Sequence, residues 1–341
     1  MTTPTLPTAP RTRSGPSVLP GIRSDRFDLR PVYEPVAFLV LAGIAYVVLP
    51  PNLQYVLGVA VIYALLATSL GMLFGWAGTY TFGHAAFFGI GAYATALLKE
   101  QQWTPLLFLV ASAVVAAVVA LLVGLAGRRL VRVEFAMLTM IVGQIAYLLT
   151  FRVPVLEGDN GIYGIPRGVI FGVDLAPAPA FWWYSLVVVT VVLGVLRRIS
   201  LSPFGEALNA IRDDPVKAAA IGIPVKAMRL AVFTLAGGVA GLAGALFAQQ
   251  GGIVTPSTLT FTFSGQLIIM ALLGGMKQFW GPAVGAIVFQ FINAMVFGSS
   301  TNATLFLGVI LLAVVLIFPN GILGLLRQAR GLFTRTTRRS R

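Results

Sequence analysis

Long apolar runs recur along this chain, separated by short polar segments or by segments that contain Pro and Gly. Most runs approach the roughly 20 residues that a membrane-crossing helix needs, and a few are shorter. The pattern predicts an all-α polytopic membrane protein with about eight to ten transmembrane helices. The expected spans are Val36–Leu49, Tyr55–Phe74, Thr81–Leu98, Leu106–Ala126, Phe135–Phe151, Ala180–Leu196, Leu230–Ala248, Gly265–Met276, Pro282–Phe297 and Leu305–Phe318.

Two of these spans look interrupted. The segment "GWAGTYTFGHAAFFGIGAY" (Gly75–Tyr93) carries five glycines and the only histidine of the chain, and Gly265–Met276 is short. Ten spans divide into two halves of five, and an odd number per half predicts two halves of inverted topology, with the interrupted span third in each. Interrupted helices at matching positions indicate a substrate path. The expected path residues are Thr81, Gly83, His84, Phe88, Gln144, Asn160, Gln266 and Gly274.

Each of these residues also has a structural interpretation. A buried histidine in a membrane helix more often satisfies a neighbouring polar group than binds a ligand, so the structural role is favoured for His84. Asn160 precedes Gly161, and Asn-Gly is common in turns. The pairs Gly71/Gly75, Gly237/Gly241 and Gly281/Gly285 favour close helix packing rather than a site.

The charges set the orientation. Charged residues make up 10% of the chain and the formal net charge is +13. With a cytoplasmic N-terminus, only Lys99, Arg152 and Arg167 of the 24 Lys and Arg residues fall on the outer side. Membrane proteins keep basic residues in cytoplasmic loops, so both termini are expected in the cytoplasm and no nucleic-acid partner is needed to explain the charge.

The same charges divide the chain into parts. Residues 1–30 are rich in Pro, Thr, Ser and Arg and are expected to form a disordered basic cytoplasmic tail, not a signal peptide. Residues 31–326 form the predicted transmembrane domain, and residues 327–341 a second basic tail. The loop 197–229 is polar, and its Pro and Gly residues predict two short helices, Phe204–Ile211 and Pro215–Ile221.

Several chemistries are excluded. The chain has no cysteine and one histidine, so neither a Cys-based metal site nor a Ser-His-Asp triad is possible, and no metal site is expected. No G-x-x-x-x-G-K-[ST] loop occurs, so the chain is not itself a P-loop ATPase. The spans carry almost no ionisable residues, which argues against a self-powered secondary carrier.

Several blocks, in order, resemble the permease subunits of branched-chain amino acid ABC importers, the LivH/LivM family, and favour its LivM-like branch. They are "GWAGTYTFGHAAFFGIGAYATALL" (Gly75–Leu98), "EFAMLTMIVGQIAY" (Glu134–Tyr147), "GDNGIYGIP" (Gly158–Pro166), the stretch Ser202–Ala248, "LLGGMKQFWGPAVGAIVF" (Leu272–Phe289) and "FPNGILGLL" (Phe318–Leu326).

The resemblance implies a non-enzymatic transport subunit in a bacterial cytoplasmic (inner) membrane that moves Leu, Ile or Val by alternating access. Its partners would be a second, LivH-like permease, two ATPase subunits that use ATP and Mg²⁺, and a periplasmic or lipid-anchored binding protein. No cofactor would be bound by this chain. The residues expected to couple it to an ATPase are Arg212, Asp213, Asp214, Pro215, Lys217, Ala218, Ala219, Ala220 and Gly222.

Two alternatives stay open. Importers of urea or short amides share nearly all of these blocks, so the substrate does not follow from the permease sequence. A stand-alone channel or secondary carrier is a reading of another class, and it predicts transport by this chain alone.

Overall fold

The computed structural model describes residues 30–101, 103–130, 133–297, 308 and 321–324. The expected span Leu305–Phe318, apart from residue 308, and both expected tails, apart from Arg30, lie outside the described residues.

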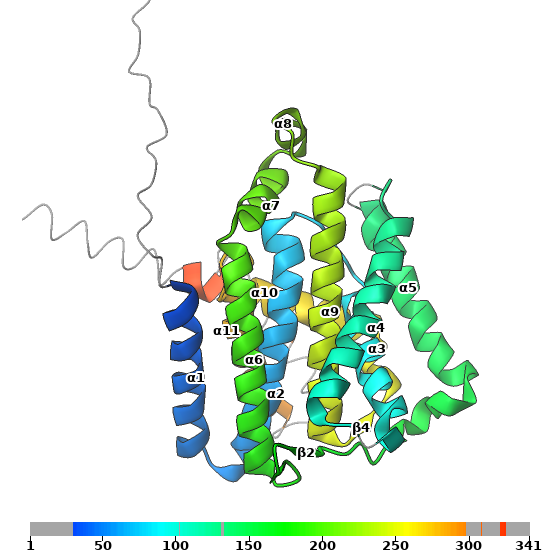
Figure 1. Ribbon diagram of the computed structural model, residues 1–341, viewed down its shortest axis with the longest axis vertical. Helices are drawn as coiled ribbons and strands as arrows, with labels where there is room; N and C mark the ends of the chain where they lie inside the picture. The colour runs from blue at the N-terminus through cyan, green and yellow to red at the C-terminus, as the bar shows by residue number, and fades with distance from the viewer. Residues whose placement is uncertain (1–29, 102, 131–132, 298–307, 309–320, 325–341) are drawn as a thin grey trace, which may run out of the picture.

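The described part of the chain is mostly helical, and most of its helices run side by side in one bundle (Figure 1). The helices are α1 (Arg30–Val48), α2 (Pro51–Gly71), α3 (His84–Leu97), α4 (Pro105–Ala126), α5 (Val133–Arg152), α6 (Ala178–Ser200), α7 (Pro203–Asp213), α8 (Pro215–Ala220), α9 (Val225–Gly251), α10 (Phe261–Gly274) and α11 (Gly281–Phe297). The short strands are β1 (Ile162–Tyr163), β2 (Val169–Ile170), β3 (Val173–Asp174) and β4 (Ile253–Val254).

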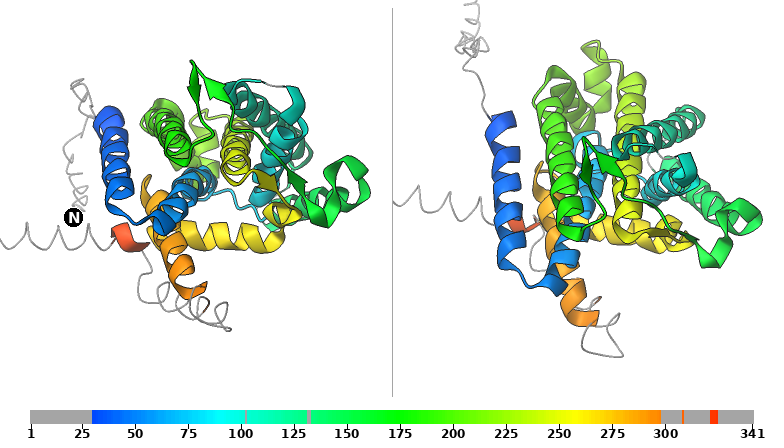
Figure 2. Two further views of the ribbon diagram at one scale, coloured as in Figure 1. Left: turned by 90° about the horizontal axis from the view of Figure 1, so that it is seen from below. Right: turned by 60° about the horizontal axis from the view of Figure 1, so that its bottom comes forward.

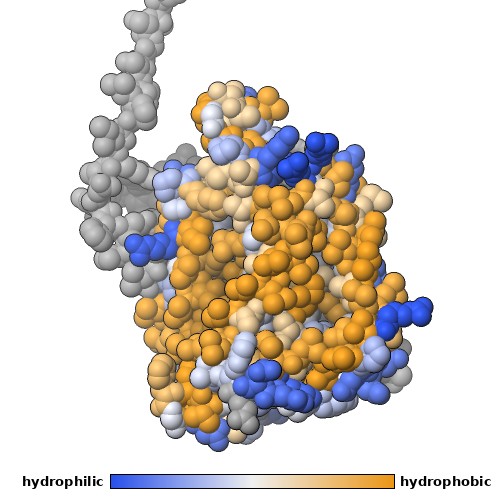
Figure 3. All heavy atoms as spheres, turned by 45° about the vertical axis from the view of Figure 1, so that its right-hand side comes forward, coloured by the Kyte–Doolittle hydropathy of each residue, from blue (hydrophilic) through white to orange (hydrophobic). Residues whose placement is uncertain are grey.

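Each of the first nine expected spans corresponds to one of these helices. Among the described residues, five helices are long and apolar enough to cross a membrane, namely α2 with the turn that extends it, α4, α5, α6 and α9. Four shorter apolar helices are α1, α3, α10 and α11. A wide apolar band covers the face shown in Figure 3, and hydrophilic residues gather at its upper and lower margins. This surface matches a bilayer between two aqueous phases.

Helices α2 and α9 form the centre of the bundle. The other helices pack around these two in a matching pattern, so that a neighbour of α9 has a counterpart beside α2. Helix α4 packs along α9, and α11 packs along α2. Helix α3 contacts α4 and α9, while α10 contacts α11 and α2. Both α3 and α10 have 14 residues, too few to cross a bilayer as one straight helix. Figure 2 shows α10 lying across the bundle rather than along it.

Small residues bring the central helices close together. A Cβ added at Gly241 would lie 2.3 Å from the Cβ of Ala116, and one added at Gly237 would lie 2.4 Å from the Cβ of Ala120. Gly91 of α3 faces the backbone of Gly241 from the other side. Backbones can approach this closely only where side chains are small, so the packing role predicted for Gly237/Gly241 is confirmed.

A partly buried ion pair joins α1 to α6 and to the turn before α11. Arg197 Nε lies 2.7 Å from Glu34 Oε2, and Trp280 Nε1 donates to the same oxygen at 2.7 Å. The two charged side chains are 15% and 19% exposed, and the Arg197 guanidinium lies over the Phe279 ring. These contacts hold the first helix of the bundle against the later half of the chain.

At the end of the bundle opposite α8, the loop between α5 and α6 is fastened to the end of α9. Strand β1 pairs with β4, and β2 pairs with β3. Arg167 donates to the carbonyls of Gln250 at 3.0 Å, Gln249 at 3.3 Å and Ala176 at 2.8 Å. A cation at a helix C-terminus satisfies carbonyls that have no partner within the helix.

Candidate functional site

The chain breaks its helical path between α2 and α3. Helix α2 passes into a π-helical turn, Met72–Trp76, and Gly78 then adopts φ +60°, a conformation that favours glycine. Helix α3 begins only at His84. The interruption expected in the span Thr81–Leu98 lies at its start, because Thr81, Phe82 and Gly83 are not helical.

Polar side chains from two other helices hold the start of α3. The main-chain N–H of Phe82 donates to Thr139 Oγ1 of α5 at 3.2 Å, and that of Ala85 donates to Ser264 Oγ of α10 at 3.1 Å. The first N–H groups of any helix lack partners within it, and Ser264 supplies a partner for that of Ala85, while Thr139 holds Phe82 just before the helix. Gly83 lies against the carbonyl of Thr139, where a Cβ would not fit. The two short helices, α3 and α10, are thus joined directly by the bond from Ala85 to Ser264.

His84 lies inside the subunit and contacts α2. It is 1% exposed, and its Nε2 lies 2.8 Å from Ser69 Oγ. Ser69 Oγ also lies 2.7 Å from the carbonyl of Leu66, which can accept its hydrogen. This geometry supports the structural role for His84, since the side chain links the first turn of α3 to α2.

The other expected path residues do not converge on one cavity. Three are buried within the subunit: Thr81 accepts from the N–H of Gly83, Phe88 packs among aromatic rings, and Gly274 faces the backbone of Gly281. Gln144 and Gln266 are half-buried on α5 and α10, and Asn160 is exposed in the loop near the β-strands. The structure brings Thr81, Gly83 and His84 together in the break and leaves Asn160 at the opposite end of α3.

The two helices expected in loop 197–229 are present as α7 and α8, at one end of the bundle (Figure 1). Asp214 separates them, and its carboxylate accepts from the N–H groups of Val216 and Lys217 at 3.0 and 3.1 Å. These bonds cap α8, and the Lys217 N–H bond above all lowers the pKa of Asp214. Gly222, at φ +89°, ends the hairpin.

Two of the charged residues expected to contact an ATPase are well exposed on the α7–α8 hairpin. Asp213 is 69% exposed and Lys217 86% exposed, with Lys217 Nζ 3.2 Å from Asp214. Arg212 instead turns toward the bundle: it donates to the carbonyl of Gly75, and its side chain covers Gly78. Helix α7 is thereby attached to the break between α2 and α3.

The outer surface of α8 is apolar. Val216 and Ile221 are each 76% exposed, whereas Ala218 packs against the bundle and Ala219 and Ala220 are exposed. The sequence does not single out these two side chains, because one lysine and three alanines lie between them.

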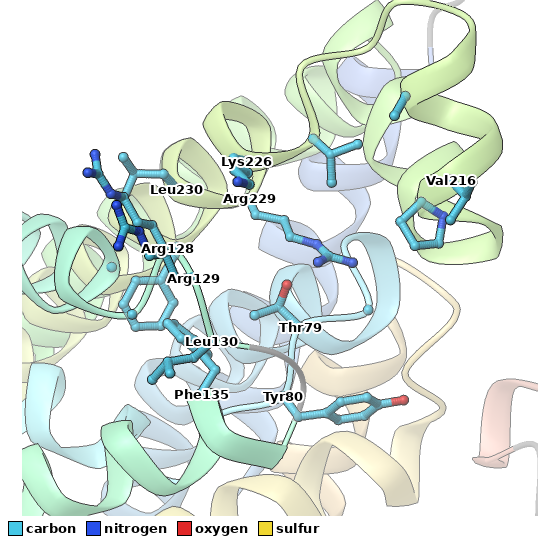
Figure 4. A pocket seen from close by; sticks show the side chains of 17 residues that line it. Thr79, Tyr80, Arg128, Arg129, Leu130, Phe135, Val216, Lys226, Arg229 and Leu230 are labelled. Atoms are coloured by element: carbon cyan, nitrogen blue, oxygen red, sulfur yellow. The ribbon is translucent and has the colours of Figure 1, made fainter.

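A cavity of about 680 Å³ lies beneath α8 (Figure 4). Its walls come from the end of α4, the start of α9, α8 itself and residues 78–80 of the break. Figure 4 shows the Arg229 side chain extending toward Thr79. Four basic residues line this cavity: Arg128, Arg129, Lys226 and Arg229. No group of three or more His, Asp or Glu residues that could hold a metal occurs among the described residues.

The apolar bundle, its interrupted helix and its protruding α7–α8 hairpin define a polytopic membrane protein built for transport. The chain belongs to the family described as the branched-chain amino acid transport system permease component, which matches residues 52–317. The family resemblance found in the sequence is thereby confirmed.

Curated relatives agree with this assignment. The high-affinity branched-chain amino acid transport system permease protein LivM of Escherichia coli K12 is 26% identical over 92% of this chain and 80% of its own length. LivH of the same organism is 26% identical over 77% of this chain and 91% of its own. The autoinducer 2 import system permease protein LsrC of Salmonella paratyphi B is 28% identical over 40% of this chain and 44% of its own. No solved structure matches.

Proposed function

We propose that this chain is the translocation subunit of an ATP-driven importer of branched-chain amino acids. The observation that carries the proposal is the connection from α8 through Arg212 to Gly75, because it joins an exposed docking element to the interrupted helix. A transport cycle driven by a separate ATPase needs such a connection between the partner and the path. The names of LivM and LivH support the substrate class.

The topology that suits this role has about ten spans and both termini in the cytoplasm. Residues 31–326 form the membrane domain, and residues 1–30 and 327–341 are its basic tails. Two inverted halves would account for the reciprocal packing of α4 on α9 and of α11 on α2, and for the equal lengths of α3 and α10. The α8 end is cytoplasmic in this arrangement, and the membrane is the bacterial inner membrane.

Two ATPase subunits bind on the cytoplasmic side of the permease, and α8 is the element of this chain that contacts one of them. ATP and Mg²⁺ belong to those subunits, and this chain binds no cofactor. Val216 and Ile221 supply the apolar contact, and Asp213 and Lys217 surround it with charge. A binding protein delivers substrate to the opposite end, where Arg167 secures the outer loop.

The substrate moves between this chain and a second, LivH-like permease. Phe82 and Phe261 support a path on the face of α5 and α10. Their rings lie 6.1 Å apart, and the side chains are 41% and 44% exposed. Gln144 and Gln266 are the half-buried polar side chains on those helices. Buried His84 takes a structural role in this proposal.

A reconstituted system tests the proposal. The chain, the second permease, two ATPases and the binding protein in vesicles should take up leucine, isoleucine and valine only with ATP. Uptake of urea or acetamide in preference to leucine would support the runner-up substrate class. Uptake by this chain alone, without ATP, would overturn the importer proposal in favour of a channel or carrier.

The docking role has its own test. Ile221→Glu places a charge in the apolar tip of α8 and should abolish co-purification of the ATPase. Arg198→Glu, an exposed change at the same end of the bundle but on α6, is the matched control and should retain it. Retention of the ATPase by both variants would overturn the assignment of α8.

A further inference from the structure

The basic cavity beneath α8 has a second, adjoining hollow. The hollow measures about 370 Å³ and is lined by residues of α4, the turn after it and α9. Arg128, Arg129 and Lys226 line both spaces. The same cations therefore face a cavity inside the bundle and a groove on its outside.

The charge of this region is one-sided. Four basic residues line the larger cavity, and none of its described lining residues is Asp or Glu. Three of these cations, Arg128, Arg129 and Lys226, also line the adjoining hollow, and an anionic group placed among them is stabilised. Guanidinium groups bind phosphate oxygens through paired N–H donors, and Lys adds a point charge. The chemistry favours a phosphate-bearing ligand.

The remaining lining is apolar. The larger cavity is also lined by four apolar residues, Leu130, Phe135, Leu230 and Phe233. A fully solvated anion would gain no stabilisation from contact with these side chains. The outer hollow adds Leu125, which is 41% exposed at the end of α4. Along α4, Val114, Val118 and Leu122 are also exposed. A continuous apolar strip thus runs from the middle of the bundle to the basic residues.

We propose that this region binds an acidic phospholipid. The headgroup phosphate lies among Arg128, Arg129 and Lys226, and an acyl chain follows the exposed face of α4. The continuity of the cavity with a surface that faces lipid selects a lipid over a soluble phosphate, and basic pockets between membrane helices bind such headgroups. This inference goes beyond the proposed transport function, because it requires neither a substrate nor an ATPase.

Site-specific quenching tests the inference. Since the chain has no cysteine, Leu125→Cys gives a single labelling position beside the hollow. A fluorophore there, in the full chain in lipid nanodiscs, is quenched by phospholipids with brominated acyl chains. We expect a relative affinity about tenfold higher for phosphatidylglycerol than for phosphatidylcholine, given the attraction of Lys and Arg for anionic headgroups. The same label at Val195→Cys, exposed on α6, should show no preference.

Two double variants, each of which removes two positive charges, identify the residues that bind the headgroup. R129Q/K226Q in the Leu125→Cys background should abolish the preference for phosphatidylglycerol, whereas R198Q/K277Q, which removes two exposed charges outside the cavity, should keep it. Equal quenching by both lipids in the parent would overturn the proposal, as would a preference that survives R129Q/K226Q. Loss of the preference with excess inorganic phosphate, but not with sodium chloride of equal ionic strength, would identify a soluble phosphate as the ligand and reject the lipid.

Discussion

The guanidinium of Arg212 donates a hydrogen bond to the main-chain carbonyl of Gly75, and so joins the last turn of α7 to the π-helical turn that ends α2. The two residues are 137 positions apart in the sequence. We expect a displacement of α8 to reach the residues that lead into α3, because α7 connects α8 to this hydrogen bond.

Substitution of Arg212 by Gln should separate docking from transport. A hydrogen bond from a charged donor contributes about 1.5–3 kcal/mol, and Gln supplies neither the charge nor the reach. We expect the ATPase to co-purify as before while ATP-driven uptake falls at least about tenfold, since 1.4 kcal/mol corresponds to a factor of ten. Arg198→Gln serves as the control. Undiminished uptake by Arg212→Gln would show that the contact does not transmit motion.

His84→Gln should reduce stability without altering substrate choice. The change disturbs the bond to Ser69, and an unsatisfied buried polar group costs about 1–3 kcal/mol. A melting temperature lower by a few degrees is expected in detergent. Ser69→Ala removes the same contact and should act similarly. A changed order of preference among leucine, isoleucine and valine in His84→Gln would contradict a structural role.

Gly241→Ala should lower the stability of the protein, whereas Gly265→Ala should raise it. A Cβ at Gly241 meets Ala116 at 2.3 Å, so the central helices must separate, at a cost of about 1–3 kcal/mol. At Gly265, inside α10, nothing lies within 4 Å of the added Cβ, and alanine favours a helix by roughly 0.5–1 kcal/mol. Thermal unfolding of both variants measures the difference. Equal melting temperatures would contradict the packing described for α4 and α9.

The effects on stability of replacing Glu34 and of replacing Arg197 should not be additive. Removal of one partner of a fully buried pair costs about 3–5 kcal/mol, and a smaller loss is expected here, because water partly screens the charge that remains. Glu34→Gln should destabilise the bundle, and adding Arg197→Gln should recover part of the loss. Thermal unfolding in a double-mutant cycle gives the coupling energy. Additive effects of the two changes would show that the charges do not act as a pair.

The cap of α8 should not respond to mild acid. The pKa of Asp214 is lowered from its ordinary 3.8, chiefly by the bond from the Lys217 N–H, so its contribution is complete above that value and is lost as pH falls below it. Amide exchange at Val216 and Lys217, corrected for intrinsic rates, should therefore be equally slow at pH 8 and pH 5. Asp214→Ala should exchange faster at both values, and Asp214→Asn should stay close to the parent. Faster exchange of the parent at pH 5 would contradict the lowered pKa.

The sequence predicted the helices well, because long apolar runs and the Pro, Gly and Asp residues of loop 197–229 act locally. It missed the late start of α3, since residues 81–83 are as apolar as the helix that follows. It also could not predict that Ser69 meets His84 or that Ser264 caps Ala85, because such pairs depend on how α2 and α10 pack against α3. The positive-inside pattern accounts for Arg128 and Arg129 as an orientation signal but not for their meeting with Lys226 in one cavity.

Helix α9 runs without interruption from the α8 end of the bundle to the opposite end. It has 27 residues without a proline, which corresponds to about 40 Å, and it follows α8 directly. At its far end Arg167 holds its last carbonyls to the outer loop, so that loop cannot lift away without leaving them unpaired. One uninterrupted helix therefore connects the loop between α5 and α6 to the segment that follows α8.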